Sequence, residues 1–281
     1  MTSPAPATAN SSLPTIAFIG GGNMASAIIG GLIHQGHPAS QIEVVEPWAE
    51  AREALRKNYG IEAQAEAGPA LQRAQIVVWA VKPQTFKDAA AQAKAHTQGA
   101  LHLSVAAGIR SDSIAQWLGT ERIVRTMPNT PALVGKGMSA IYARPAVTPA
   151  ERQSVEAIMA STGEFLWVES ETQLDAVTAL SGSGPAYVFY FLEAMTRAGV
   201  GMGLTEAQAH HLAVGTFVGA SELARRSDES PAVLRERVTS KGGTTYAALQ
   251  SMEASGVSQA FEAAMRAAEK RANELGNEFG S

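Results

Sequence analysis

The chain has 281 residues, of which 46% are hydrophobic and 17% are charged, and it contains no cysteine. This composition excludes a disordered or collagen-like chain, a disulfide-stapled scaffold, and any thiolate nucleophile or metal ligand. With 22 basic and 26 acidic residues the net charge is −4, which gives no bulk attraction to nucleic acid or to an anionic membrane. A chain of this length suggests two domains.

The N-terminal segment MTSPAPATANSS has neither the basic start nor the apolar stretch of a signal peptide. No apolar run in the sequence approaches the roughly 20 residues of a membrane span. We therefore expect residues 1–13 to form a disordered tail on a cytoplasmic protein that binds neither membrane nor nucleic acid.

From Pro14 onward, short apolar runs typical of buried strands alternate with segments of helical spacing. This alternation predicts right-handed crossovers and a mostly parallel sheet with helices on both faces, so we expect residues 14–168 to form a Rossmann-type, doubly wound α/β domain. The predicted strands are 15–20, 42–46, 75–81, 100–105, 122–127, 139–143 and 164–168. The predicted helices between the first strands are 23–35, 48–58, 84–95 and 112–118.

Beyond Val168 the pattern changes, because nearly every segment has helical spacing. The predicted helices are 171–180, 184–198, 206–225, 231–238, 244–255 and 258–275. Residues 184–224 are apolar on more than one face, which is more than a surface helix of a monomer needs. We expect residues 169–281 to form an all-helical domain buried against a second subunit, with burial inside one larger bundle as the alternative.

The first strand runs directly into Gly20-Gly21-Gly22-Asn23-Met24-Ala25, which has the G-x-G-x-x-A form of a dinucleotide-binding turn. A side chain at the first glycine would obstruct the turn, and one at the third would block the pyrophosphate. The amides that open the following helix can hold the phosphates. We predict a nucleotide site that includes Gly20, Gly21, Gly22, Asn23 and Met24.

Glu46 ends the second strand, where a carboxylate normally accepts a hydrogen bond from the adenosine ribose and repels a 2′-phosphate. This position favours NADH. Arg52, one turn into the next helix, could pair with a phosphate instead, or it could be a solvated surface residue. The sequence alone leaves the choice of cofactor open.

Two further loops follow strands that end at the same edge of the predicted sheet, where ligands bind in open α/β folds. The first contains Ala80, Val81, Lys82 and Pro83, and its lysine could approach the nicotinamide ribose or simply face water. The second contains Ala106 and Ala107, whose small side chains permit close approach of a flat ring or plain packing. We include both loops in the predicted cofactor site.

The six histidines form no metal-binding constellation, and the segment 181–189 lacks a lysine that could serve an alcohol dehydrogenase of similar plan. A second unusual turn, Ser240-Lys241-Gly242-Gly243-Thr244-Thr245, opens a predicted helix. Its amides and hydroxyls can bind a small carboxylate at a helix N-terminus or serve only as an N-cap. The sequence therefore predicts no metal site and offers this turn as a candidate substrate site.

The chain resembles the pyrroline-5-carboxylate reductases, the last enzymes of proline synthesis, from about Pro14 to Leu275. The motifs that carry the resemblance are FIGGGNMA (18–25), AVKPQ (80–84), SVAAG (104–108), MPNTP (127–131), DAVTALSGSGPAY (175–187) and VTSKGGTTYAAL (238–249). The resemblance implies hydride transfer from NAD(P)H to (S)-1-pyrroline-5-carboxylate, giving L-proline. It also implies a helical domain that interlocks with its counterpart in a dimer, and assembly of dimers into a ring.

By the same resemblance, the Thr245 hydroxyl approaches the ring nitrogen as the catalytic group, and Gly242, Gly243 and Thr244 hold the carboxylate. Ser240 and Glu171 are further substrate-binding candidates, although an exposed carboxylate in a first helical turn is also a common surface feature. Family members commonly prefer NADPH, whereas Glu46 departs from the small polar residue often found at its position. The expected cofactor is NADP(H), with NAD(H) as the alternative because of Glu46.

Two other functions are compatible with these motifs. One is reduction of a related cyclic imine, such as a six-membered homologue, which a comparison of kcat/KM across ring sizes would separate. The other is a regulator that binds a dinucleotide without turnover, which would bind NADPH and show no imine-dependent oxidation.

Overall fold

The computed structural model describes residues 13–279, so the predicted disordered tail lies outside the described residues except for Leu13. The chain forms two compact units. The first runs to Gly182 and takes in the chain again from Glu269 onward, and the second comprises Ser183–Ala268. Residue 168, where the sequence pattern changes, lies inside the first unit, 14 residues before Gly182.

The first unit is built on a seven-stranded sheet in the order β2-β1-β3-β4-β5-β6-β7. The strands are β1 (Ile16–Ile19), β2 (Ile42–Val45), β3 (Ile76–Trp79), β4 (Leu101–Ser104), β5 (Ile123–Met127), β6 (Gly137–Ala143) and β7 (Gly163–Trp167). Neighbouring strands are parallel except β5 and β6. The predicted doubly wound, mostly parallel sheet is confirmed.

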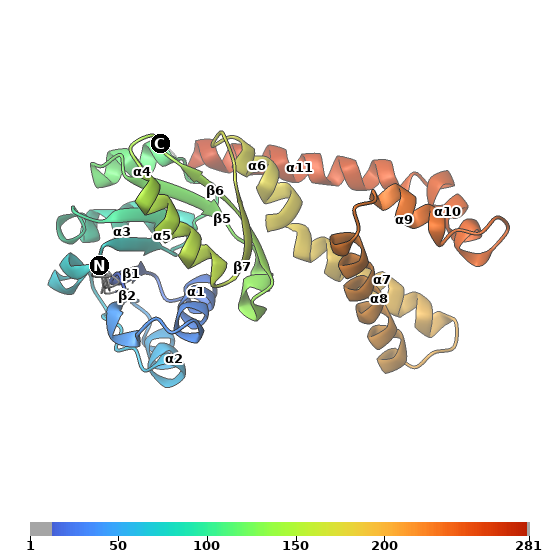
Figure 1. Ribbon diagram of the computed structural model, residues 1–281, viewed down its shortest axis with the longest axis horizontal. Helices are drawn as coiled ribbons and strands as arrows, with labels where there is room; N and C mark the ends of the chain where they lie inside the picture. Colours follow the sequence, from blue (N-terminus) through green and yellow to red (C-terminus); the bar gives the residue numbers. More distant parts are fainter. Residues whose placement is uncertain (1–12, 280–281) are drawn as a thin grey trace, which may run out of the picture. The chain divides into compact units, whose positions relative to one another are not determined.

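Helices cover both faces of this sheet (Figure 1). They are α1 (Asn23–His34), α2 (Ala49–Tyr59), α3 (Pro83–Ala93), α4 (Ser111–Leu118) and α5 (Pro149–Ala160). Because side chains alternate along a strand, Phe18 packs with Ile28 of α1 on one face, while Ala17 and Trp79 pack with Phe86 of α3 on the other. The helix α5 was not among the predicted elements, although Thr148 and Glu151 form a capping box at its start.

One helix was expected over residues 171–180, and the structure has two short elements there. The helix α6 (Gln173–Val177) continues into a π-helical turn, η5 (Thr178–Gly182). Beneath this turn, a Cβ added to Gly182 would lie 2.5 Å from Cε of Met127, so the turn packs closely on the end of β5.

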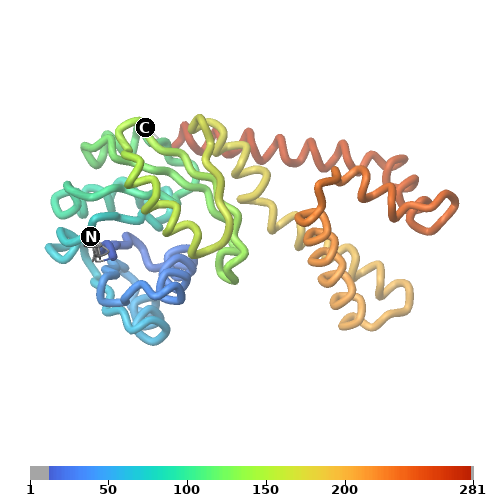
Figure 2. The backbone as a smooth tube through the Cα atoms, in the orientation of Figure 1, coloured from blue at the N-terminus to red at the C-terminus, as the bar shows by residue number. Residues whose placement is uncertain are grey.

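The second unit is entirely helical, as predicted, and its backbone can be followed from α7 to α11 in Figure 2. Its elements are α7 (Gly184–Gly201), α8 (Glu206–Arg226), α9 (Pro231–Arg237), α10 (Thr244–Ala254) and the first half of α11 (Val257–Glu278). The hairpin of α7 and α8 is tight, because a Cβ on Gly199 would lie 2.7 Å from Cβ of Ala209. Within residues 183–268, all of which are described, only Gly199, Ala209 and Ala213 are buried.

Candidate active site

The glycine turn lies where the chain order of the sheet reverses. From β1 the chain passes outward to β2 and then back across to β3 on the other side of β1. In open α/β sheets this reversal leaves a crevice at the carboxyl ends of the strands, which is where ligands bind. The three strand ends are joined there, since Gly20 N–H donates to the Val45 carbonyl and Ala80 N–H donates to the Ile19 carbonyl, both at 2.8 Å.

Gly20 and Gly22 have the two different properties that a dinucleotide turn requires. Gly20 has a φ of +97°, and a Cβ there would lie 2.5 Å from the Ala80 carbonyl oxygen. A Cβ on Gly22 would meet nothing within 4 Å. Gly22 is also the N-cap of α1, whose first turn contains no acidic residue and no side-chain cap. The first turn of α1, at Gly22, Asn23 and Met24, therefore has the open N–H groups of a helix N-terminus, an arrangement that can bind phosphate.

The two other predicted loops follow neighbouring strands at the same edge. Ala80 to Pro83 comes directly after β3, and Val81 Cγ1 lies 3.1 Å from the position of a Cβ on Gly20. Ala106 is buried and its N–H donates to the Ser104 hydroxyl at 3.3 Å, while Ala107 is half-buried. Lys82 is exposed at the start of α3. The structure thus brings the predicted cofactor residues together around the ends of β1, β3 and β4.

Glu46 lies at the end of β2 against this turn rather than projecting into water. Its carboxylate is buried, with Oε2 accepting a hydrogen bond from Gly21 N–H at 2.7 Å and Oε1 accepting one from Trp48 N–H at 2.9 Å. Arg52 Nη1 donates to the carbonyls of Glu46 at 2.9 Å and Pro47 at 2.6 Å. Glu46 therefore holds the shape of the turn itself, a role that its position in the sequence did not reveal.

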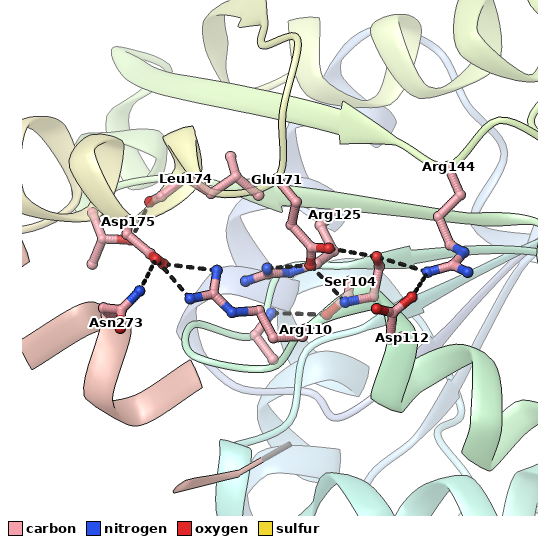
Figure 3. Close-up of polar contacts among 12 residues, drawn as sticks. Ser104, Arg110, Asp112, Arg125, Arg144, Glu171, Leu174, Asp175 and Asn273 are labelled. Atoms are coloured by element: carbon pink, nitrogen blue, oxygen red, sulfur yellow. Dashed lines mark hydrogen bonds and ion pairs between the residues drawn. The ribbon is translucent and has the colours of Figure 1, made fainter. Parts of the chain in front are cut away.

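Glu171, predicted as a substrate-binding residue, is part of a buried arginine–carboxylate network (Figure 3). Its Oε1 accepts hydrogen bonds from Ser111 N–H and Arg125 Nη1, and its Oε2 accepts one from the Ser111 hydroxyl, each at 2.6 Å. Glu171 thereby caps the start of α4 and neutralises Arg125 on β5. Burial lowers the pKa of Arg125, while the attraction of Glu171 opposes that shift.

The same network extends to Asp175 and the C-terminal part of α11. Arg110 donates two hydrogen bonds to the Asp175 carboxylate, at 2.7 and 3.2 Å, and Asn273 Nδ2 donates to it at 3.2 Å. The fork of Arg110 fits a carboxylate in two-point contact. Glu171 and Asp175 thus tie α6 to the sheet and to α11, which the sequence could not show because the partners lie far apart along the chain.

Asn129 anchors the loop that follows β5. Its Nδ2 donates to the Ser181 carbonyl at 3.1 Å and its Oδ1 accepts from Met138 N–H at 2.9 Å. The 3-10 helix η4 (Thr130–Val134) begins at the next residue. Both sides of the Asn129 amide are therefore used to hold the MPNTP segment at the edge of the sheet.

The second candidate site belongs to the helical unit and is a single turn before α10. Gly242 is left-handed with a φ of +74°, and a Cβ on Gly243 would lie 2.6 Å from the Ser240 hydroxyl oxygen. Gly243 N–H donates to the Ser240 carbonyl at 3.0 Å, and no acidic residue or side-chain cap occupies the first turn of α10. Ser240, Gly242 and Thr244 are exposed, and Thr245 is half-buried. Apart from that of Gly243, the amides of this turn are available to a small anion.

Two negative findings apply to the described part of the chain. Across residues 13–279, no group of three or more histidine, aspartate or glutamate side chains is arranged to hold a metal ion. None of the helices there is both long and apolar enough to cross a membrane.

A doubly wound sheet with a G-x-G-x-x-A turn at its reversal point defines a dinucleotide-binding protein of the Rossmann class. The comparisons with known proteins specify it further. A model of NADP oxidoreductases, coenzyme F420-dependent, matches residues 15–108, and a model of pyrroline-5-carboxylate reductase dimerisation matches residues 171–275. A pyrroline-5-carboxylate reductase of Pseudomonas aeruginosa is 44% identical over 271 residues, which cover 96% of this chain and 99% of the relative. The chain belongs to the pyrroline-5-carboxylate reductase family.

Solved structures agree over the same length. A pyrroline-5-carboxylate reductase of Coxiella burnetii superposes with a TM-score of 0.87 at 36% identity, covering 94% of this chain and 99% of that one. A pyrroline carboxylate reductase of Plasmodium falciparum, solved with NADP bound, has a TM-score of 0.85 at 28% identity, covering 94% and 98%. The fold of both units is therefore shared with solved members of the family.

Proposed function

We propose that this chain reduces (S)-1-pyrroline-5-carboxylate to L-proline with a hydride from NAD(P)H. The observation that carries the proposal is the match to pyrroline-5-carboxylate reductases over 96% of the chain, with the open glycine turn and the Ser240–Thr245 turn both formed. When bound, the reduced nicotinamide supplies the hydride, which goes to the imine carbon of the ring, the C5 atom of the product. The ring nitrogen gains one proton, so the C=N double bond becomes a secondary amine.

The chain's own residues have two tasks in this reaction. The amides of Gly242 and Thr244 hold the substrate carboxylate at the start of α10, and Gly243 and Ser240, whose main chains are bonded to each other, shape the turn beside them. The Thr245 hydroxyl makes a hydrogen bond to the ring nitrogen, and it orients a protonated imine or relays a proton from water, since a threonine hydroxyl is a poor acid. No covalent intermediate is needed, which fits a chain without cysteine.

On the cofactor side, Gly20 to Met24 hold the pyrophosphate, and the loops Ala80–Pro83 and Ala106–Ala107 border the nicotinamide half. The same proposal covers self-association through the helical unit as an interlocked dimer, supported by its exposed apolar side chains. Assembly of dimers into a ring and a cytoplasmic location rest on the family resemblance alone.

The test is loss of absorbance at the reduced-nicotinamide band with pyrroline-5-carboxylate, run in parallel with NADPH and NADH. Thr245→Val is expected to lower kcat/KM by about 100-fold, a usual loss for a proton-handling group, while Thr245→Ser keeps most of the activity because the hydroxyl stays. Equal activity of Thr245→Val and the wild type would remove Thr245 from the reaction. A six-membered cyclic imine in the same assay distinguishes a preference for ring size, and dinucleotide binding without any imine-dependent oxidation would identify a regulator.

A further inference from the structure

The carboxylate of Glu46 is fixed by hydrogen bonds at both oxygens. Only 6% of this residue is exposed, and its two oxygens accept from the N–H groups of Gly21 and Trp48 at 2.7 and 2.9 Å. To turn the carboxylate away, the protein would have to break both bonds and leave two amides unpaired, one of them inside the glycine turn. Its negative charge therefore stays where the fold puts it.

The fold puts this charge beside the adenosine half of the dinucleotide site. Cγ of Glu46 lies 3.2 Å from the position of a Cβ on Gly21, so the side chain lies directly against the turn that precedes α1. In Rossmann folds a carboxylate at the end of the second strand faces the adenosine ribose. A 2′-phosphate on that ribose would meet a buried carboxylate of the same sign, and such repulsion is screened less than at an open surface.

Among the described residues, no cation forms an ion pair with this carboxylate. Arg52 Nη1 is tied to the main-chain carbonyls of Glu46 and Pro47, at 2.9 and 2.6 Å, and so its guanidinium is held along the loop. The next arginine of α2, Arg56, forms an ion pair at 2.6 Å with Glu53. A 2′-phosphate would therefore have to draw Arg52 from these carbonyls or Arg56 from Glu53.

We infer that the adenosine side of this site selects the dinucleotide without a 2′-phosphate, NADH over NADPH, and that Glu46 sets this preference. The inference rests on the proposed function, because it concerns the hydride donor of the same reaction. The inferred preference differs from the dinucleotide seen in the Plasmodium falciparum relative, which was solved with NADP bound.

The experiment measures binding rather than turnover, by calorimetric titration of the full-length protein with ADP-ribose and with the same compound carrying a 2′-phosphate. Wild-type protein is expected to bind ADP-ribose about tenfold or more tightly than the phosphorylated compound, by a ratio that falls as salt is added. Glu46→Gln is expected to reduce the ratio to near unity. The matched control is Glu50→Gln, which removes an exposed carboxylate from the first turn of α2 and should leave the ratio unchanged.

The ratio of the two affinities in the wild-type protein tests the preference for NADH even if Glu46→Gln does not fold. Equal or tighter binding of the phosphorylated compound by wild type overturns it, and continued reduction of pyrroline-5-carboxylate with NADPH would then leave the proposed function intact. A Glu50→Gln change as large as that of Glu46→Gln would assign the effect to net charge instead of this carboxylate. Binding of neither compound would overturn both proposals.

Discussion

The two units of this chain bury their apolar side chains to very different extents. In the first unit many large apolar side chains, including Phe18, Trp79 and Phe86, are fully buried between the sheet and its helices. In the second unit the buried residues are Gly199, Ala209 and Ala213, while many large apolar side chains are exposed. Among the most exposed are Phe189 (58%), Tyr190 (66%), Met202 (78%), Leu212 (57%), Val218 (66%) and Leu223 (69%). A helical unit of this kind cannot provide its own core and needs a second copy to cover it.

The largest expected effect comes from placing charge on the exposed face of α8. Leu212 and Leu223 lie on one side of this helix, about three turns apart. The double change Leu212→Asp with Leu223→Asp would bury four carboxylates in a two-fold interface, so we expect the dimer dissociation constant to rise by about 1,000-fold or more. Light scattering during gel filtration should show monomers. Val134→Asp, at a side chain of the first unit that is 74% exposed, is the matched control and should leave the dimer intact.

The next effect tests the polar interior of the first unit. Arg125→Met removes one member of a buried pair and leaves the Glu171 carboxylate with Ser111 alone, so we expect a loss of about 3 kcal/mol in the free energy of unfolding. Urea denaturation measures this loss. The control is Arg266→Met in the second unit, whose pair with Glu262 spans 3.7 Å between exposed side chains and should change stability by less than about 0.5 kcal/mol. If both variants lost the same free energy of unfolding, the buried ion pair of the first unit would not differ in stability from the exposed pair of the second.

A pH effect of intermediate size is expected from His102 on β4. Trp79 Nε1 donates to its Nδ1 at 3.0 Å, and burial lowers the pKa of this histidine to about 4. The unfolded chain binds a proton at this histidine near pH 6.5, whereas the folded chain binds it only near pH 4. Protonation therefore favours the unfolded state between these values. The free energy of unfolding keeps its full value above pH 6.5 and decreases as the pH falls toward 4. The wild type should lose about 2 kcal/mol between pH 7.5 and pH 5 through this residue.

The measurement for this effect is urea denaturation of His102→Asn at both pH values, since asparagine keeps an acceptor for Trp79. Between pH 7.5 and pH 5 the free energy of unfolding of the variant should therefore fall by about 2 kcal/mol less than that of the wild type. His34→Asn, at an exposed histidine of α1, should behave as the wild type does. An undiminished pH dependence in His102→Asn would show that the buried imidazole is not its source.

The smallest effects come from two equivalent helix caps, one in each unit. Thr148 begins α5 and Thr205 begins α8, each with a complete capping box. Replacing either threonine by alanine should cost about 1 kcal/mol, because an orphan amide loses its acceptor. Hydrogen exchange should show faster exchange at the start of the altered helix only. If Thr205→Ala also weakened protection throughout the dimer face while Thr148→Ala stayed local, the dependence of the second unit on its partner would be confirmed.

The sequence predicted the sheet well because each strand is a short apolar run whose neighbours are set by the alternation of strands and helices. The helix α5 was missed although its capping box, at Thr148 and Glu151, is a local signal that could have revealed it. The predicted helix over residues 171–180 became α6 and a π-helical turn, since packing of Gly182 on Met127 is a tertiary constraint.

Side-chain partners were less predictable than elements. The turn at Gly20 could be found from spacing alone, because the chemistry of a dinucleotide turn lies in consecutive residues. Glu171 meets Ser111 and Arg125, which are 60 and 46 positions away, so no local pattern announces the contact. The roles of Glu46 within the turn and of His102 beneath Trp79 depend on contacts of the same kind.

The C-terminal half of α11 has a consequence for how the chain folds during synthesis. Asn273 reaches Asp175 across 98 positions, and Leu275 Cβ lies 3.0 Å from the position of a Cβ on Gly108. The ribosome therefore makes the whole sheet and the whole helical unit before it makes the last piece of the first unit. Until then Asp175 and the loop around Gly108 lack these partners, and closure of the first unit must wait for residues added after its sheet has formed.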